Sequence, residues 1–341
     1  MTLVVRHFGP DPHTVGGMAT VIRMFAEHGL GADIVNVSPT WTPESTLTTA
    51  RLYGAATRAL LEMHTPQVAH VHLSERGSFL REGSLVALAR RRGLITVATI
   101  HGASFVAFAR RCPRLVSSVL QRAHLVICLE PGALKLVQWV APKVRSEIVP
   151  NPIFIDSHFV PADDSAEVVV FAGEISLRKG ADVLHRAWQL VAQRRPNARC
   201  LMVGPPADFA PPRTERLVVR QAVGPLEMEN ILRAARVVAL PSRAEAMPMI
   251  LIEAMSSGRP FVSTPVGGIP ELAAQGGLLV PVDDARGLAN CLTDLLAKPE
   301  LARDIGERGR QFCLETRSCG VIDERLRTLY SLAAPELSSR Y

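Results

Sequence analysis

The sequence predicts an α/β protein made of two consecutive doubly wound parallel-sheet units. Short apolar runs alternate with longer segments of helical periodicity, which is the pattern of strands and crossover helices. The alternation stops at Val149-Pro150-Asn151-Pro152, where two prolines favour an extended connector, and it restarts after that stretch. A length of 341 residues also suits two domains of ordinary size.

The first half contains six apolar runs that we expect to be strands, at residues 3–8, 33–37, 68–73, 95–100, 125–129 and 147–149. The helical segments expected there include residues 18–27, 47–63 and 84–92. The second half repeats the pattern, with expected strands at residues 168–171, 199–203, 237–240, 261–263 and 278–280, a helix at residues 181–191, and an almost wholly helical pattern from residue 283 to about 332. Ligands of open α/β sheets bind beyond the carboxyl ends of the strands, so we expect functional residues there.

The composition excludes several classes of protein. The formal net charge is +6 and 48% of the residues are hydrophobic, which suits packed cores rather than disorder. No run approaches the roughly 20 apolar residues of a membrane span, and the first residues lack the basic start and cleavage site of a secretory signal. The six cysteines are scattered without a Cys-x-x-Cys pair, so neither a zinc site nor a disulfide framework is expected. We therefore expect a cytoplasmic protein.

Positive charge is concentrated in the first half of the chain. Residues 1–150 hold 16 Arg and Lys against 9 Asp and Glu, and residues 81–122 alone hold eight arginines. A basic face of this kind suits phosphate, anionic lipid or nucleic acid, and it is equally compatible with an ordinary solvated surface. Nucleic acid is the least favoured partner, because aromatic residues make up only 5% and no zinc-finger or RNP pattern occurs.

The most informative segment runs from Glu245 to Glu253, with seven residues between them. Pro248 suits the first turn of a helix, and Gly258 suits its end. The start of such a helix presents free N–H groups and the positive end of its dipole, which together suit a phosphate. The turn Gly267-Gly268-Ile269-Pro270-Glu271 follows. By itself, the segment is also what an amphipathic helix with two solvated glutamates would show.

Weaker signals lie at three other expected strand ends. Residues 173–180 follow an apolar strand and carry the adjacent cations Arg178 and Lys179, which could neutralise a leaving diphosphate. Gly16-Gly17 precedes an expected helix and could admit an anion to its start, although the Gly-x-Gly-x-x-Gly fingerprint is absent. His101 closes an apolar strand, where functional residues of open sheets gather. Each signal alone also fits a structural loop, a tight turn or a core histidine.

Taken in chain order, these elements resemble the retaining nucleotide-sugar glycosyltransferases of glycosyltransferase family 4, which have the GT-B fold. The resemblance covers nearly the whole chain, and its most specific part is the Glu245 to Glu253 segment with the turn at residues 267–271. Residues 173–180 look like the family's diphosphate loop, Gly16-Gly17 like its N-domain glycine loop, and His101 like its inter-domain histidine. More narrowly, His70-Val-His72-Leu-Ser-Glu-Arg76-Gly-Ser78-Phe79-Leu-Arg81 looks like a subgroup of bacterial exopolysaccharide transferases.

The resemblance implies an architecture and a reaction. Residues 1–150 would form a Rossmann-like acceptor domain, and residues 151–332 a Rossmann-like donor domain across a cleft, with the last helices packing back on the first domain. The enzyme would transfer a sugar, with retention, from a UDP- or GDP-sugar to a hydroxyl of a lipid-linked glycan in bacterial polysaccharide or glycoconjugate synthesis. No Asp-x-Asp motif occurs, so neither a metal nor another cofactor is expected.

The resemblance also implies three groups of site residues. The catalytic group is Glu245, His101, Lys179 and Arg178; the donor-binding group is Gly16, Gly17, Gly173, Met247, Pro248, Met249 and Glu253; and the acceptor group is Arg76, Ser78 and Arg81. The two cations and the amides at the helix start would stabilise the leaving diphosphate. Glu245 would hold sugar hydroxyls, and Glu253 would accept hydrogen bonds from the ribose hydroxyls.

Two departures from the family's pattern bear on this site. Glu174 stands where many members have arginine, so Arg178 and Lys179 would have to carry more of the phosphate charge. Pro248 stands where glycine is frequent, which removes one potential N–H donor to the sugar. In the linker, Pro152 likewise stands where glycine is common.

Two other functions are compatible with these residues: a GT-B enzyme that hydrolyses or epimerises a nucleotide sugar, and a catalytically silent protein that binds one. A further expectation concerns the membrane. Residues 85–92 and 105–114 place apolar residues beside arginines, and such stretches can lie on an anionic bilayer. We therefore expect peripheral attachment to the inner face of the plasma membrane, where a lipid-linked acceptor would be presented.

Overall fold

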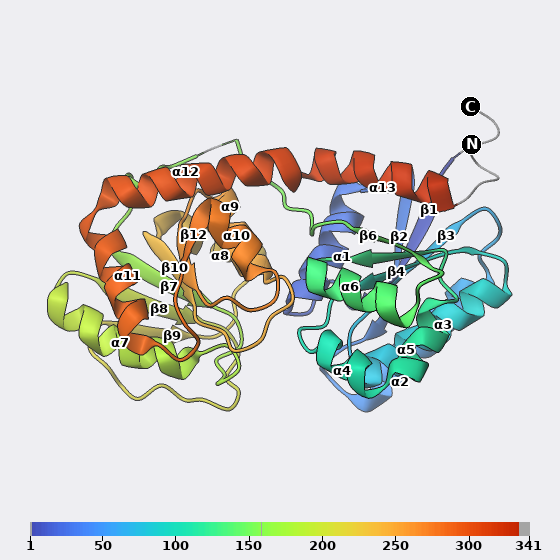
Figure 1. Cartoon of the computed structure of the whole chain (residues 1–341), viewed down its shortest axis with the longest axis horizontal. Helices are drawn as coiled ribbons and strands as arrows, with labels where there is room; N and C mark the ends of the chain where they lie inside the picture. Colours follow the sequence, from blue (N-terminus) through green and yellow to red (C-terminus); the bar gives the residue numbers. More distant parts are fainter. Residues whose placement is uncertain (1, 158, 334–341) are drawn as a thin grey trace. The chain divides into compact units, whose positions relative to one another are not determined.

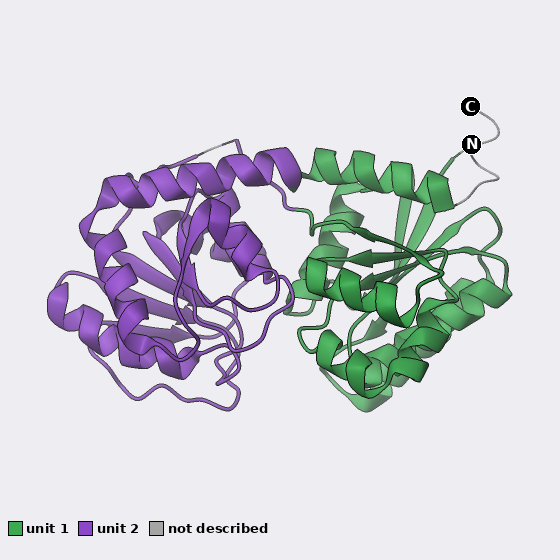
Figure 2. Cartoon of the chain, viewed as in Figure 1, with its two compact units in different colours: residues 1–152, 317–341 green, residues 153–316 purple. Residues whose placement is uncertain are grey.

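The chain folds into two compact α/β units, shown in green and purple in Figure 2. The computed structural model describes residues 2–157 and 159–333. The first unit takes in the chain up to Pro152 and again from Arg317 onward, and the second is Ile153–Thr316. The first boundary therefore lies two residues after the expected one, and the last described helix belongs to the first unit.

The first unit is built on a six-stranded parallel sheet in the order β2-β1-β3-β4-β5-β6 (Figure 1). Its strands are β1 (Val4–Pro10), β2 (Ile34–Trp41), β3 (Val68–Leu73), β4 (Ile95–Ile100), β5 (Leu125–Cys128) and β6 (Arg145–Ile148). All six expected strands are thus present. The strand order changes direction at β1 and β3, and the carboxyl ends at such a point are where ligands bind in open sheets.

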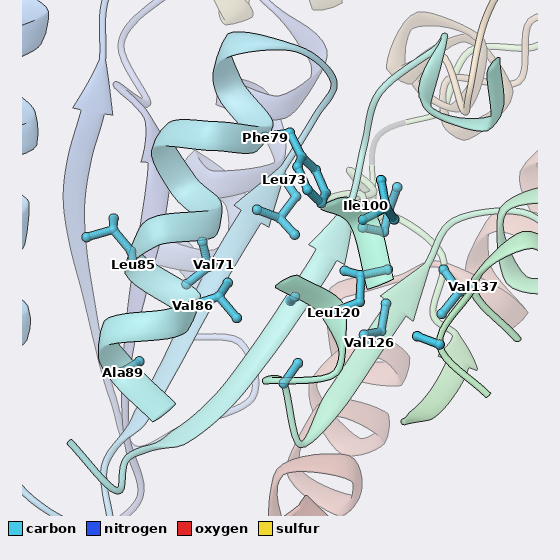
Figure 3. Packing of buried hydrophobic residues seen from close by; sticks show 14 of the residues in the cluster. Val71, Leu73, Phe79, Leu85, Val86, Ala89, Ile100, Leu120, Val126 and Val137 are labelled. Carbon is cyan, nitrogen blue, oxygen red and sulfur yellow. The ribbon is translucent and has the colours of Figure 1, made fainter. Parts of the chain in front are cut away.

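The helices of the first unit bury apolar faces against this sheet. They are α1 (Gly17–His28), α2 (Thr46–Leu61), α3 (Gly77–Arg91), α4 (Phe105–Arg111), α5 (Pro113–Leu120), α6 (Pro131–Val140) and α13 (Cys319–Ala333). In the core, Leu85 and Val86 of α3 lie near Val71 of β3, with Leu120 and Val126 close by (Figure 3). Burying side chains of this size is the main favourable term in the folding of such a unit.

This packing corrects the expected membrane-facing stretches. In residues 85–92, Leu85, Val86 and Ala89 are buried, and in residues 105–114 the same holds for Phe105 and Ala109. These apolar side chains fill the core of the first unit, so they are not available to insert into a bilayer. In the described part of the chain, no helix combines the length and the apolar character needed to cross a membrane.

The second unit has its own six-stranded parallel sheet, in the order β12-β11-β10-β7-β8-β9. Its strands are β7 (Val168–Ala172), β8 (Arg199–Val203), β9 (Leu217–Arg220), β10 (Val237–Leu240), β11 (Phe261–Ser263) and β12 (Gly277–Leu279). Its helices are the 3-10 turn η1 (Ala162–Asp164) and α7 (Ala181–Arg194), α8 (Pro225–Ala234), α9 (Met249–Ser256), α10 (Ile269–Gly276), α11 (Ala285–Ala297) and α12 (Pro299–Thr316). The predicted fold class, with two parallel sheets of α/β type, is confirmed.

Strand β9 is the one strand of the second unit that the sequence pattern did not predict. It lies at the edge of the sheet and pairs only with β8 among the described strands. Its apolar run, Leu217-Val218-Val219, is only three residues long and is flanked by Arg216 and Arg220, which is shorter than the runs by which buried parallel strands are recognised. Val218, Val219 and Arg220 are exposed.

The docking of α13 onto the first unit gives a test of the fold. Gly31 has a φ of +82°, and a Cβ atom there would lie 2.7 Å from Tyr330 Cε2 and 2.9 Å from Leu326 Cβ. We expect Gly31→Ala to lower the free energy of unfolding of the first unit by about 1–3 kcal/mol, because both the backbone and the contact are incompatible with a side chain. Denaturant unfolding of the full chain measures the loss.

Gly54→Ala is the matched control. Gly54 lies inside α2, and a Cβ atom there would meet nothing within 4 Å. The alanine should leave stability unchanged or raise it by up to about 1 kcal/mol. Equal losses in the two variants would contradict the packing described for α13.

Candidate functional site

Two loops of the second unit form the candidate site. The first connects β7 to α7 and spans residues 173–180; the second connects β10 to α9 and spans residues 241–248. Strands β7 and β10 are parallel neighbours, with Val169 opposite Val237 and Val170 opposite Val238. Both loops therefore leave the carboxyl edge of the sheet side by side, which is the edge where open α/β sheets bind ligands.

An ion pair joins the two loops. Lys179 Nζ lies 2.5 Å from Glu245 Oε1, and the Ser242 hydroxyl donates a hydrogen bond of 2.9 Å to the same oxygen. The side chains of Lys179 and Glu245 are only 15% and 7% exposed, so water screens their attraction weakly. The pair brings together two residues that the sequence analysis had placed in separate motifs.

Arg178 lies at the outer rim of this pair. Its guanidinium donates a hydrogen bond of 3.3 Å to the Ala244 carbonyl and lies 3.9 Å from Glu245 Oε1. It also forms an ion pair of 3.4 Å with Glu174. Because the Arg178 side chain is 42% exposed, its charge can reach a ligand in solution, whereas Glu174 offsets part of that charge. The glutamate at the family's usual arginine position thus has a cationic neighbour.

The start of α7 touches the second loop through a glycine. Gly180 has a φ of +72°, and a Cβ atom there would lie 2.0 Å from the Pro241 carbonyl oxygen. Only glycine allows the two backbones to approach this closely. The Arg243 amide also donates to the Arg178 carbonyl at 2.8 Å, and the Arg243 guanidinium pairs with Asp182 of α7 at 2.8 Å and 2.9 Å. These contacts hold the two loops as one assembly.

Helix α9 directs its amino-terminal end toward this edge of the sheet. Pro248 precedes its first residue, Met249, rather than lying within the first turn as expected. The side chains of Met247 and Met249 are buried, so only their backbone groups could serve a ligand. The first N–H groups of a helix have no partner within the helix, and the helix dipole makes this end positive. The backbone amides at the start of α9 are therefore compatible with the donor-binding role expected for them.

Glu253 is placed differently from Glu245. In α9, Met249, Leu251, Ile252, Ala254, Met255 and Ser256 are buried, whereas Glu253 is half-buried. It lies, with Ile250, on the less buried side of this helix. The turn between β11 and α10 contacts the second loop, since the Gly268 amide donates to the Ala246 carbonyl at 2.7 Å. Gly173, the remaining donor residue of this unit, directly follows β7.

The expected residues of the first unit fall at two places. Gly16 and Gly17 are exposed at the start of α1, as the sequence predicts. Arg76 is exposed immediately before α3, whereas Ser78 and Arg81 both bond to the buried carboxylate of Glu82 at 2.7 Å. Glu82 was not singled out by its sequence context, because a single glutamate in an arginine-rich helix carries no pattern.

His101 proves to be part of a cluster of histidines. Its Nε2 lies 2.8 Å from His72 Nδ1, and His72 Nε2 lies 2.9 Å from His7 Nδ1. His70 stacks on His72 but bonds elsewhere, to the Tyr330 hydroxyl at 2.7 Å and the Thr99 hydroxyl at 2.6 Å. Alternating residues of β3 point to one face of the sheet, which places His70 and His72 together. That spacing, seen beside His7 in a neighbouring strand, is the signal that could have revealed the cluster.

Burial keeps these imidazoles neutral. It lowers the pKa of His7 to about 3, and it lowers the pKa of His101, a half-buried residue, to about 3 as well. For His70 and His72, burial together with the neighbouring histidines lowers each pKa well below its usual value. A neutral imidazole can donate at one nitrogen and accept at the other.

Comparisons with known proteins match the part of the chain that contains the two loops. Residues 166–298 match the family described as "Glycosyl transferases group 1". The chain is 32% identical over 187 residues to the D-inositol 3-phosphate glycosyltransferase of Saccharomonospora viridis, covering 48% of this chain and 43% of that protein. It is 31% identical over 191 residues to the alpha-maltose-1-phosphate synthase of Mycolicibacterium smegmatis, covering 49% and 48%. The matched part therefore spans less than half the length of these curated relatives.

Solved structures share the fold over almost the whole chain. The sucrose-phosphate synthase of Thermosynechococcus elongatus superposes with a TM-score of 0.78 at 20% identity, covering 98% of this chain and all of that one. Anabaena Alr3699/HepE in complex with UDP-glucose superposes with a TM-score of 0.76 at 17% identity, covering 97% of this chain and all of that one. The fold is that of the GT-B glycosyltransferases.

The buried ion pair gives a test of the site's geometry. We expect Lys179→Met to lower the stability of the second unit by about 1–3 kcal/mol, because it leaves the Glu245 carboxylate buried without its cation. In a Glu245→Gln background the same change should cost at least about 1 kcal/mol less, since no charge is then stranded. Urea unfolding of the four proteins of this cycle measures the coupling, and additive losses would contradict the pair.

The histidine cluster predicts a pH dependence of stability. A histidine in the unfolded chain titrates near 6.5, so between about pH 6.5 and pH 3 the unfolded chain binds protons that the folded unit excludes. The free energy of unfolding of the first unit should therefore fall as the pH drops below about 6.5, by up to about 1.4 kcal/mol per pH unit for each buried histidine.

Denaturant unfolding over this pH range measures the slope. His7→Phe should make the slope shallower by about one proton. His13→Gln, which removes an exposed imidazole outside the cluster, is the control. Stability that stays constant between about pH 7 and pH 5 would contradict the burial of neutral imidazoles.

Proposed function

We propose that the whole chain is a retaining glycosyltransferase acting on a nucleotide sugar. The proposal starts from the match of residues 166–298, in its second unit, to the group 1 glycosyltransferases. The observation that carries the proposal is the Lys179–Glu245 ion pair between two neighbouring loops at the carboxyl edge of the second sheet. A cation for diphosphate and a carboxylate for sugar hydroxyls are thereby held within one hydrogen bond of each other. A nucleotide sugar presents its diphosphate and its sugar hydroxyls side by side.

In the proposed reaction, the bond between the sugar's anomeric carbon and the diphosphate oxygen breaks. A bond from the acceptor hydroxyl forms on the same face, and the hydroxyl proton leaves with the nucleoside diphosphate. Negative charge develops on the diphosphate, where Lys179, Arg178 and the amides at the start of α9 stabilise it. Fixed donors and charges in a poorly screened site are worth more than the same groups in water.

The two glutamates divide the donor between them. Glu245, held by Lys179 and Ser242, accepts hydrogen bonds from hydroxyls of the transferred sugar. Glu253, half-buried on the less buried side of α9, accepts them from the ribose. The cations of the first loop supply the electrostatic stabilisation that a metal supplies in other transferases, so we propose that the enzyme needs neither a metal nor another cofactor.

We propose UDP as the nucleotide in preference to GDP. Several structures that share this fold are described with UDP or a UDP-sugar, among them the HepE complex with UDP-glucose. The likeness of fold does not extend to the base, so the experiment includes both nucleotides.

The acceptor is proposed to carry phosphate. Relatives of this chain are named for D-inositol 3-phosphate, and residues 1–150 carry the chain's excess of positive charge. Arg76 immediately precedes α3, and Arg81 lies in the second turn of that helix, which follows β3 in the chain. A lipid-linked diphosphate glycan, as in polysaccharide synthesis, and a small phosphorylated polyol both offer this chemistry, and the acceptor arms of the experiment separate them.

A turnover panel tests the function. UDP- and GDP-sugars are supplied with a polyprenyl-diphosphate-linked glycan or with inositol phosphate, in the presence of a chelator, and the anomeric configuration of the product is read by proton NMR. We expect a UDP-sugar to give a product with the donor's configuration. Free sugar formed whether or not an acceptor is present would indicate a hydrolase, a changed sugar with the nucleotide still attached would indicate an epimerase, and binding without turnover a silent protein.

The division of labour between the glutamates has a separate test. Glu253→Gln should weaken binding of free UDP by about tenfold, because a charged hydrogen bond to the ribose becomes a neutral one. Glu245→Gln should leave UDP affinity near that of the wild type and lower kcat, since its proposed contacts are to the sugar. Calorimetry with UDP and steady-state kinetics measure both, and equal loss of UDP affinity in the two variants would contradict the assignment.

We also propose that the enzyme is cytoplasmic and binds anionic membrane by charge alone. Arg90, Arg91 and Arg92 are exposed at the end of α3, and Arg110, Arg111 and Arg114 are exposed around α4 and α5. Each basic residue near an anionic surface contributes about 1 kcal/mol before screening. Because the apolar neighbours of these arginines are in the core, nothing in these stretches anchors the protein once salt screens the charges.

Changing Arg90, Arg91 and Arg92 together to Ser tests this attachment. The wild type should co-sediment with vesicles that contain phosphatidylserine at low salt and be released at high salt, and the triple variant should bind at least about tenfold more weakly. Neutral phosphatidylcholine vesicles are the control. Binding that persists at high salt would overturn the charge-only attachment and point to an apolar anchor.

A further inference from the structure

His101 is the end of a row of hydrogen-bonded imidazoles that runs into the core of the first unit. The row passes from His101 to His72 and from His72 to His7 through N···N contacts of 2.8 Å and 2.9 Å. The row crosses from the end of β4 to β3 and then to β1, three strands that are neighbours in the sheet. Nothing in the proposed reaction uses His7 or His72, so their burial there needs its own account.

The hydrogen count of the row allows only two arrangements. Each neutral imidazole carries one N–H, and each N···N contact needs one hydrogen. Either all donors point from His7 toward His101, or all point the other way. The direction at one end therefore fixes which nitrogen carries the hydrogen at the other end.

The inner end of the row decides between the two directions. Within the described part of the chain, His7 Nε2 is a buried atom without a hydrogen-bond partner. If the donors point inward, this nitrogen carries a hydrogen with no acceptor; if they point outward, it is bare. Buried N–H groups without an acceptor are rarer in proteins than under-satisfied buried acceptors, so the outward direction is favoured.

We propose that His7 and His72 are positioning residues that hold the hydrogen of His101 on Nδ1. In this arrangement His7 donates to His72, His72 donates to His101 Nε2, and His101 Nδ1–H is left as a directed donor. The part of the inference that concerns catalysis rests on the proposed function, with His101 in the catalytic role that the family resemblance implies for it. The tautomer itself does not depend on that function.

A metal ion does not explain the same cluster. His7, His70 and His72 do bring potential ligand atoms within 4.8 Å of one another. The rings of His70 and His72 are stacked, however, with centroids 4.6 Å apart and planes at 13°, so their in-plane lone pairs run alongside one another instead of converging. Both nitrogens of each ring are also already hydrogen-bonded.

The groups that surround the row are compatible with donors that point from His7 toward His101. Tyr330 of α13 bonds to His70 and not to the row, and burial raises the pKa of its hydroxyl above the usual value. Glu75, in the loop after β3, receives the Ser74 hydroxyl at 2.9 Å and lies against Gly102, the residue after His101. Glu75 is therefore the one acidic side chain that these contacts bring next to the outer end of the row.

Nitrogen-15 NMR of the full chain with labelled histidine tests the tautomer directly. The expected result is a hydrogen on Nδ1 of His7, His72 and His101 at neutral pH. In His72→Phe, the His101 signal should change to that of a mixed or Nε2-protonated ring. A wild-type His101 that carries its hydrogen on Nε2 would overturn the proposal, whatever the activity of the protein.

Kinetics then test the positioning role, with His70→Phe as the matched control. His72→Phe and His7→Phe should lower kcat by about tenfold with little change in donor KM, because one directed hydrogen bond is lost from the reaction. His70→Phe removes an equally buried, stacked histidine outside the row and should retain kcat.

The outcomes separate the inference from the proposed function. Equal losses in all three variants would indicate a purely structural role and overturn the positioning. An Nδ1 hydrogen on His101 in a protein that transfers no sugar would uphold the tautomer and reject the function. If His72→Phe fails to fold, the wild-type spectrum and the His7→Phe variant still decide.

Discussion

The Lys179–Glu245 ion pair is the interaction on which the rest of the candidate site depends. It joins the loops that follow two neighbouring parallel strands, and both partners are nearly removed from water. Burying either charge alone would be strongly unfavourable, so each partner is the condition for the other's position. The close backbone approach at Gly180 and the Arg243–Asp182 contacts serve the same geometry. In the proposed reaction, a diphosphate that takes over the lysine's charge would leave the carboxylate free to bind sugar, which would couple the two halves of donor recognition.

In contrast to the buried ion pair of the second unit, the first unit buries a cluster of neutral histidines. Its histidines are buried as neutral rings, which avoids the cost of a charge but requires each nitrogen to find a partner. In the row, both nitrogens of His72 and the Nδ1 of His7 have a partner, whereas His7 Nε2 has none among the described residues. Glu82 of the same unit is buried as a charged group, beside Arg81, and accepts hydrogen bonds from the Ser78 and Thr40 hydroxyls. The hydrogen bonds of the histidines and those of the Glu82 carboxylate both fix side chains at the carboxyl edge of the sheet.

The sequence predicts the fold well because a buried parallel strand is a continuous apolar run. Strands β3, β5 and β10 are buried along their whole length, whereas β9 is an exposed edge strand. The motifs of the second unit were also recognisable, but Lys179 and Glu245 are 66 positions apart, and no local pattern shows that they meet. The same limit hides the row of His7, His72 and His101, which three separate strands bring together. The expectation that apolar residues of 85–92 face a membrane was wrong, because core-facing apolar residues next to surface arginines look the same in sequence as a membrane-binding stretch.

Hydrogen–deuterium exchange of the full chain with and without saturating UDP tests the central claim most directly, because it locates the donor without requiring an acceptor. If the two loops form the donor site, UDP should protect the amides of residues 173–180 and those at the start of α9, and GDP should protect the same amides at a higher concentration. Protection should be lost in Lys179→Met. UDP that binds by calorimetry but leaves both segments exchanging as before would contradict the account.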